Sequence, residues 1–257
     1  MSFALSISLL CVGLFLGIVL ALELGRRLGR RRLSKEPSGT LRGTGAIEGA
    51  VFALLGLLVA FTFSGAASRF DDRRKLIIDE TNAIGTAYLR LDLLPPDAQP
   101  ALRASFRRYV DARVEVYRKL PDLSAARTEL ARGKELQQEI WQRAVAASSA
   151  APAPAMLLLL PALNAMFDLA STRTLNAWIH PPLTIFVMLG AFVLVGALFA
   201  GHGMAESKTR SAIHVLGLAA SLAISVYVIL DLEYPRRGLI RIDAFDRALV
   251  ELGQSMR

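Results

Sequence analysis

The feature that most constrains this chain is a set of four long runs without a full charge. The hydrocarbon core of a bilayer is about 30 Å thick, so a helix rising about 1.5 Å per residue needs about 20 apolar residues to cross it. The runs lie at 2–22, 49–68, within 174–203 and at 211–230, and charged residues follow each of them. We therefore expect four transmembrane helices.

The charged residues of the chain concentrate between and around these runs. The 257 residues are 53% hydrophobic and 20% charged, with a mean hydropathy of +0.42. This composition is too apolar for a water-soluble domain and too charged for a chain wholly in lipid. We predict an all-α integral membrane protein with an inserted helical soluble domain. Its expected parts are 1–68, the first helix pair with a basic loop; 69–176, the soluble domain continuing from the second span; 177–232, the second pair; and 233–257, an amphipathic C-terminal segment.

Helical periodicity continues through the middle of the chain. No proline occurs between 69 and 94, so we expect the second span to continue as one helix to the proline-rich turn that follows. Further helices are predicted over 99–120 and from 121 onward, ending in an Ala/Pro linker at 144–155. The apolar segment 156–167 is only a dozen residues long and contains Pro161, so we expect an interfacial or buried helix there rather than a span.

Basic residues beside the spans bear on orientation. The first run has no preceding basic residues and is followed by several, which is typical of a retained helix rather than a signal peptide. The first loop holds seven Lys/Arg, and short loops weigh most in the positive-inside rule. We expect an inner-membrane, multi-pass protein with short loops in the cytoplasm and the soluble domain on the periplasmic or extracellular side. Cys11 is the only cysteine, so no intramolecular disulfide is possible.

Charge and motifs argue against an enzyme or a nucleic-acid binder. The net charge of +8 comes from residues clustered at membrane edges, where anionic lipid headgroups are the expected partner. No nucleophile elbow, P-loop or zinc-binding motif occurs, and His180, His202 and His214 lack metal-ligand spacing. We predict no catalytic residues, no metal and no cofactor. Asp71–Asp72 and Asp79–Glu80 are interpreted as surface residues paired with neighbouring basic side chains.

The second span is the most informative segment because small residues recur in it every three or four positions. Such a face lets helices pack closely in a membrane. The alternative is that it lines the central axis of an oligomer, with Phe61 or Phe63 forming an apolar constriction. The small residues are Gly45, Gly49, Ala53, Gly56, Ala60, Ser64 and Ala67.

Two segments resemble the bestrophin-like family, which is remotely similar to bestrophin anion channels. They are EGAVFALLGLLVAFTFSGAASRFDDRRKLIIDETNAIGTAYLRLDLLP and, after the last span, LDLEYPRRGLIRID. The resemblance implies a pentameric anion channel whose second membrane helix lines the pore, and it places the soluble domain in the cytosol, against the charge-based expectation. The acidic calcium-binding cluster of the animal channels is not found, so calcium gating is not expected. The implied pore-lining residues are Ala53, Leu57 and Phe61, with Gly65 on the same face, and the basic pore mouth is Arg69, Arg73 and Arg74.

The second of these segments follows the last span and has the character of a structural motif. Asp231 and Glu233 precede Pro235, which should end the helix, and Gly238 should permit a turn. Two functions remain open from the sequence. One is an oligomeric, pentameric anion channel. The other is a non-conducting membrane-anchored scaffold or sensor acting through the soluble helical domain.

Overall fold

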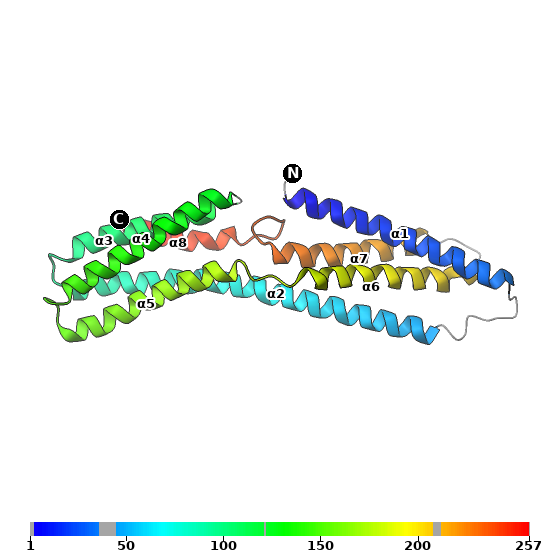
Figure 1. Ribbon diagram of the computed structural model, residues 1–257, viewed down its shortest axis with the longest axis horizontal. Coiled ribbons are helices and arrows are strands. Elements are labelled where there is room, and N and C mark those ends of the chain that lie inside the picture. Colours follow the sequence, from blue (N-terminus) through cyan, green and yellow to red (C-terminus); the bar gives the residue numbers. More distant parts are fainter. Residues whose placement is uncertain (1–2, 36–44, 121, 208–211, 257) are drawn as a thin grey trace. The chain divides into compact units, whose positions relative to one another are not determined.

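A computed structural model describes residues 3–35, 45–120, 122–207 and 212–256 (Figure 1). Within these ranges the chain is nearly all helical and contains no strand, which confirms the all-α prediction. Its contacts divide it into two compact units, each with its own packing. The first unit is Met1–Arg69 with His180–Leu239, and the second is Phe70–Ile179 with Ile240–Arg257.

The first unit consists of long apolar helices. α1 (Phe3–Lys35) packs along α6 (Leu183–Gly203) and also against α7 (Ala212–Glu233), and the short η3 (Met204–Glu206) extends α6. The N-terminal part of α2 (Gly45–Leu89) contacts α6 where Leu55 and Phe52 approach Gly196. By length and composition alone, five described helices could cross a membrane: α1, α2, α6, α7 and one helix of the second unit.

Glycines bring α1 and α6 into backbone contact. A Cβ added at Gly25 would overlap the carbonyl oxygen of Leu198, and one added at Gly201 would overlap that of Leu22. A side chain at Gly29 would collide with Ala205. Small residues allow such close approach between membrane helices, where water supplies no hydrophobic driving force. The position of α1 on α6 therefore depends on these glycines.

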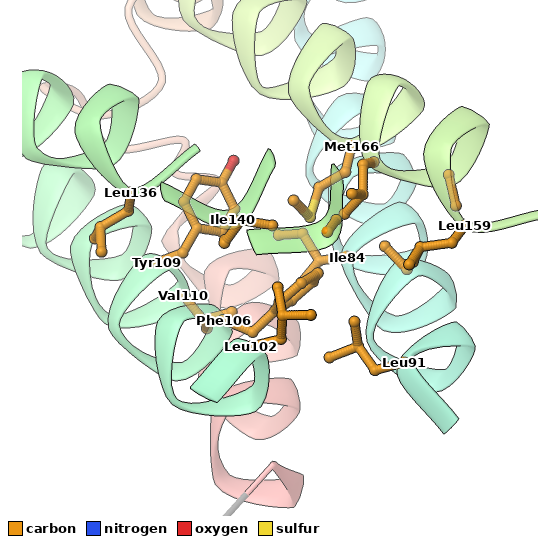
Figure 2. Packing of buried hydrophobic residues seen from close by; sticks show 14 of the residues in the cluster. Ile84, Leu91, Leu102, Phe106, Tyr109, Val110, Leu136, Ile140, Leu159 and Met166 are labelled. Atoms are coloured by element: carbon orange, nitrogen blue, oxygen red, sulfur yellow. The ribbon is translucent and has the colours of Figure 1, made fainter. Parts of the chain in front are cut away.

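The second unit is a helical bundle around one hydrophobic core. α2 continues into it and ends in the short η2 (Arg90–Leu93), followed by α3 (Gln99–Arg118), α4 (Leu123–Ala147) and α5 (Ala153–Asn176). The C-terminal segment adds η4 (Asp243–Phe245) and α8 (Asp246–Ser255), and α8 packs on α3. Figure 2 shows core side chains from several of these helices meeting one another. Those labelled are Ile84, Leu91, Leu102, Phe106, Tyr109, Val110, Leu136, Ile140, Leu159 and Met166.

Several helix boundaries follow the sequence prediction. α2 is a single helix through residue 89, and α3 lies within the expected 99–120. Asp122 caps α4, because its carboxylate accepts hydrogen bonds from the backbone amides of Ser124 and Ala125. Pro121 lies outside the described residues. Leu123, the first residue of α4, is 38% exposed.

The linker and the short apolar helix were predicted wrongly. Helix α4 continues to Ala147 and α5 begins at Ala153, so the expected linker at 144–155 is helical at both ends and non-helical only in its middle. Alanine, which dominates this stretch, is the strongest helix former, and this outweighed the composition argument. Helix α5 has 24 residues rather than a dozen and runs through Pro161, which lies on its exposed face. Its opposite face is buried in the core at Leu159 and Leu163.

Candidate functional site

The N-terminal part of α2 leaves one face uncovered by the rest of the first unit. Between residues 45 and 69 only Leu55 and Ala66 are buried. Ala53 and Leu57 lie on the opposite side, and Phe61 is the most exposed large side chain of this segment, at 68%. Three of the four expected pore-lining residues therefore share a face that is exposed within the part of the chain that the structure describes.

Gly65, the fourth expected pore-lining residue, is only partly exposed. A Cβ there would lie 3.2 Å from an Nη of Arg69, so the guanidinium of Arg69 lies beside this glycine. The small residues of α2 nevertheless face mostly outward. No heavy atom would lie within 4 Å of a Cβ at Gly45, Gly49 or Gly56. Close packing within the chain accordingly does not explain the small-residue face.

Arg69 anchors the end of this α2 segment to the end of α7. Its Nε donates a 2.8 Å hydrogen bond to Oε1 of Glu233, and its Nη2 binds the same oxygen. Glu233 is fully buried, whereas the Arg69 side chain is 28% exposed. His180 Nδ1 lies 3.6 Å from the other oxygen of Glu233, and the His180 ring stacks on Tyr234. A buried carboxylate thus holds two basic side chains from other elements.

The segment after α7 is organised by a second carboxylate, that of Asp231. Leu239 N donates to its two oxygens at 2.9 and 3.1 Å. A Cβ at Gly238 would overlap this carboxylate, so a side chain there would have to displace Asp231 from its contact with Leu239 N. Gly238 was expected to permit a turn, and the structure adds that its lack of a side chain leaves room for the Asp231 carboxylate. α7 ends at Glu233, two residues before the buried Pro235.

Arg73 and Arg74, the other expected pore-mouth residues, belong to the second unit and contact its own groups. Arg73 is buried and donates a 3.0 Å hydrogen bond to the carbonyl oxygen of Ile179. Arg74 pairs with Asp71 at 3.0 Å, and its guanidinium lies 4.4 Å from the centre of the Phe245 ring. Neither arginine is a freely solvated cation.

A buried charge network that the sequence analysis missed joins four helices of the second unit. Glu80 on α2 accepts hydrogen bonds from Arg113 on α3 at 2.6 Å and from Arg173 on α5 at 2.7 Å. Arg173 also binds Asp246 of α8 at 2.6 Å, and its guanidinium lies 3.7 Å from the centre of the Tyr117 ring. The interpretation of Glu80 as a surface residue is wrong, because its side chain is completely buried.

The environment of Glu80 favours its ionised form. Burial raises the pKa of this carboxyl, but the charges and hydrogen bonds of Arg113 and Arg173 outweigh burial and hold the pKa below its ordinary value. A sequence signal for this site did exist. Glu80 follows Ile77 by three residues and precedes Ile84 by four, so helical spacing places it in a buried row. Its interaction partners could not be read from the sequence, since they lie on distant helices.

The remaining titratable groups of the first unit give no ligand cluster. His202 Nδ1 lies 3.5 Å from Glu48 Oε1, which pairs α6 with the start of α2. Among the residues that the structure describes, no group of three or more His, Cys, Asp or Glu could hold a metal ion.

Comparisons with known proteins agree with this architecture. The Bestrophin-like domain family model matches residues 11–244. No curated protein matches the chain. A crystal structure of a bacterial bestrophin homologue from Klebsiella pneumoniae, carrying a point mutation, aligns with a TM-score of 0.73 at 14% identity, covering 96% of this chain and 98% of that chain. Another variant of that homologue aligns with a TM-score of 0.67 at 16% identity, covering 99% of each chain.

These solved structures have the same fold as this protein. At 14–16% sequence identity, the similarity shows the fold alone. The family model, in contrast, spans most of the chain. Together with the long apolar helices, it supports a multi-pass membrane protein. The chain belongs to the bestrophin-like family.

Proposed function

We propose that this chain is a subunit of a homo-oligomeric anion channel of the inner membrane, in which the N-terminal part of α2 lines the pore. Family membership and fold support a channel-like function. The observation that carries the proposal is the uncovered face of α2. A helix that its own chain leaves bare and that presents small side chains is suited to surround an axis with its copies.

The pore surface proposed on α2 is formed by Ala53, Leu57, Phe61 and Gly65. Leu57 and Phe61 are its large members and are both more than half exposed. In an oligomer, rings of such side chains would form an apolar constriction that controls conduction by losing its water. A pentamer is the stoichiometry that the family resemblance favours.

The membrane arrangement is part of the same proposal. We place four spans in the parts 1–68 and 177–232, with 69–176 in water and 233–257 as an amphipathic segment beside it. The basic first loop favours a periplasmic or extracellular soluble domain. A cytosolic soluble domain, as the family resemblance implies, is the alternative. Anionic lipid headgroups remain the proposed partner of the basic membrane edge.

The proposed basic pore mouth consists of Arg69, Arg73 and Arg74, and two of these residues form ion pairs within the chain. Arg69 pairs with the buried Glu233, and Arg74 pairs with Asp71. Opposite charges in contact weaken the field that each would produce alone. We therefore propose that Arg69 acts mainly by fixing the end of the pore segment, and that its attraction for anions is secondary.

Reconstitution tests the proposal against the alternative of a non-conducting scaffold or sensor. Purified protein in chloride-loaded liposomes should release chloride faster than protein-free liposomes do. Release equal to that of protein-free liposomes, from protein that remains oligomeric in detergent, would favour the scaffold. In that case the uncovered face of α2 would serve only for packing between subunits.

A further inference from the structure

The first helix continues well beyond its apolar run. Residues 23–35 extend α1 by about 20 Å past Leu22, where the apolar run ends. Leu24 and Leu28 on this extension are 53% and 45% exposed, so apolar surface accompanies its charges. The basic residues of the extension are Arg26, Arg27, Arg30, Arg31, Arg32 and Lys35.

Arg26 differs from the other five because it is buried. Only 9% of it is exposed, and within the described residues its one hydrogen bond runs from Nη2 to the carbonyl oxygen of Ser207, at 3.4 Å. Its Nε is buried and has no hydrogen-bond partner among the described residues. A guanidinium has five N–H donors, so most of its donor capacity is unused. Glu206, beside Ser207, is exposed and forms no ion pair with Arg26 within the described chain.

A buried guanidinium with unfilled donors calls for an anion. Burial of a charge without a counter-charge is unfavourable, and unsatisfied buried donors in native proteins commonly mark an unrecorded ion or ligand. Arg30 lies one turn further along α1, is exposed, and has no recorded partner among the described residues. Two guanidinium groups at this spacing match the oxygens of one phosphate, which arginine binds in a bidentate manner.

We propose that Arg26 and Arg30 form a binding site for the phosphate of an anionic phospholipid at the end of the first span. The neighbouring cations would add electrostatic attraction, and the exposed leucines would contact the acyl chains. We assign the phosphate to a lipid because the site directly follows an apolar run long enough to cross a bilayer and lies beside the exposed Leu24 and Leu28. The proposal requires membrane insertion but not conduction, so it can fail without the channel assignment failing.

Lipid retention in native mass spectrometry tests the site. Protein released from nanodiscs of equal parts phosphatidylglycerol and phosphatidylcholine should retain the anionic lipid preferentially. Arg26→Gln should lower this retention about tenfold, the effect of losing one charged hydrogen-bonding group. Arg27→Gln is the matched control. It removes the same charge one residue away, but Arg27 is exposed and already bound to Glu23, so retention should stay within about twofold.

Two further arms keep the test decisive. If Arg26→Gln does not yield folded protein, Arg30→Gln replaces it, because an exposed residue can be changed without disturbing packing, and it too should lower retention of phosphatidylglycerol. Inorganic phosphate added to the wild-type protein should not displace the lipid. Displacement by phosphate, equal retention of the two lipids, or equal losses in Arg27→Gln and the site variants would each overturn the proposal.

Discussion

Glu80 is the residue on which the second unit most depends. Its buried carboxylate pairs with two arginines from separate helices, Arg113 of α3 and Arg173 of α5. A buried ion pair gives little net stability compared with well-packed apolar residues, but removal of one partner leaves an uncompensated charge. The network therefore makes the mutual arrangement of α2, α3 and α5 specific.

Replacement of this carboxylate should be costly. We expect Glu80→Gln to destabilise the protein by about 3–5 kcal/mol, because the buried Arg113 would lose its acidic partner and Arg173 would keep only Asp246. Thermal unfolding of the purified protein in detergent measures the effect. Glu115→Gln is the control, since it breaks a surface pair with Arg118 and should cause little change. Equal effects of the two substitutions would contradict the assigned role of Glu80.

The contribution of Glu80 to stability should also depend on pH. Arg113 and Arg173 hold the pKa of Glu80 below its ordinary value of about 4.3. The folded state then binds fewer protons than the unfolded state, so this contribution to stability is complete above the unfolded pKa and is lost as the pH falls toward the folded pKa. The difference in melting temperature between wild type and Glu80→Gln should narrow from about pH 7 to about pH 3. A constant difference would contradict this account.

At the scale of elements, the crossing of α1 and α6 is the contact with the least tolerance for change. We predict that Gly25→Ala destabilises the protein, since the new methyl group would collide with the backbone of α6 at Leu198. Gly13→Ala on the same helix meets nothing within 4 Å and provides the control. Thermal stability and monodispersity in detergent report the outcome. An undisturbed Gly25→Ala protein would show that the helices can separate without cost.

The elements also show what the sequence could predict. The continuation of α2 through residue 89 followed from the absence of proline, and α4 begins close to the helix start predicted at residue 121. Long-range contacts did not follow in the same way. Nothing local to Gly238 shows that the carboxylate of Asp231 occupies the space where its side chain would be. Pro161 likewise argued against a long helix, but it lies within α5 on the exposed face.

At the scale of the whole molecule, orientation in the membrane is open to direct measurement. The basic first loop predicts that a cysteine at Ser38, in a Cys11→Ser background, is labelled only from the cytoplasmic side. Ser38 lies outside the described residues. If a membrane-impermeant thiol reagent labels this cysteine in intact cells, the predicted orientation is wrong and the soluble domain lies in the cytosol.

The candidate pore also belongs to this scale, because a single chain cannot form it. The residues proposed to line it could be named from the sequence and its family resemblance, and the structure adds that Phe61 is uncovered within the chain. No property of one subunit reveals whether copies of this face meet around water or against one another. Whether ions pass along this face must therefore be tested on the assembled protein, by changing the side chain of Phe61.

Phe61→Ala is that experiment, read by chloride flux from liposomes and by thermal stability of the same preparation. If Phe61 helps form an apolar constriction, its truncation should raise the flux, with little change in stability, because no cavity opens inside the subunit. Phe52→Ala is the control. Phe52 packs toward Gly196 of α6, so its truncation should lower stability without raising the flux.

The opposite pattern at Phe61 would contradict the channel proposal. If Phe61 packs between helices of neighbouring subunits, its truncation should cost about 3–5 kcal/mol through the cavity that it leaves. A Phe61→Ala protein that melts at a lower temperature and releases chloride no faster than wild type would give that result. A more conductive protein of unchanged stability is the result that we predict.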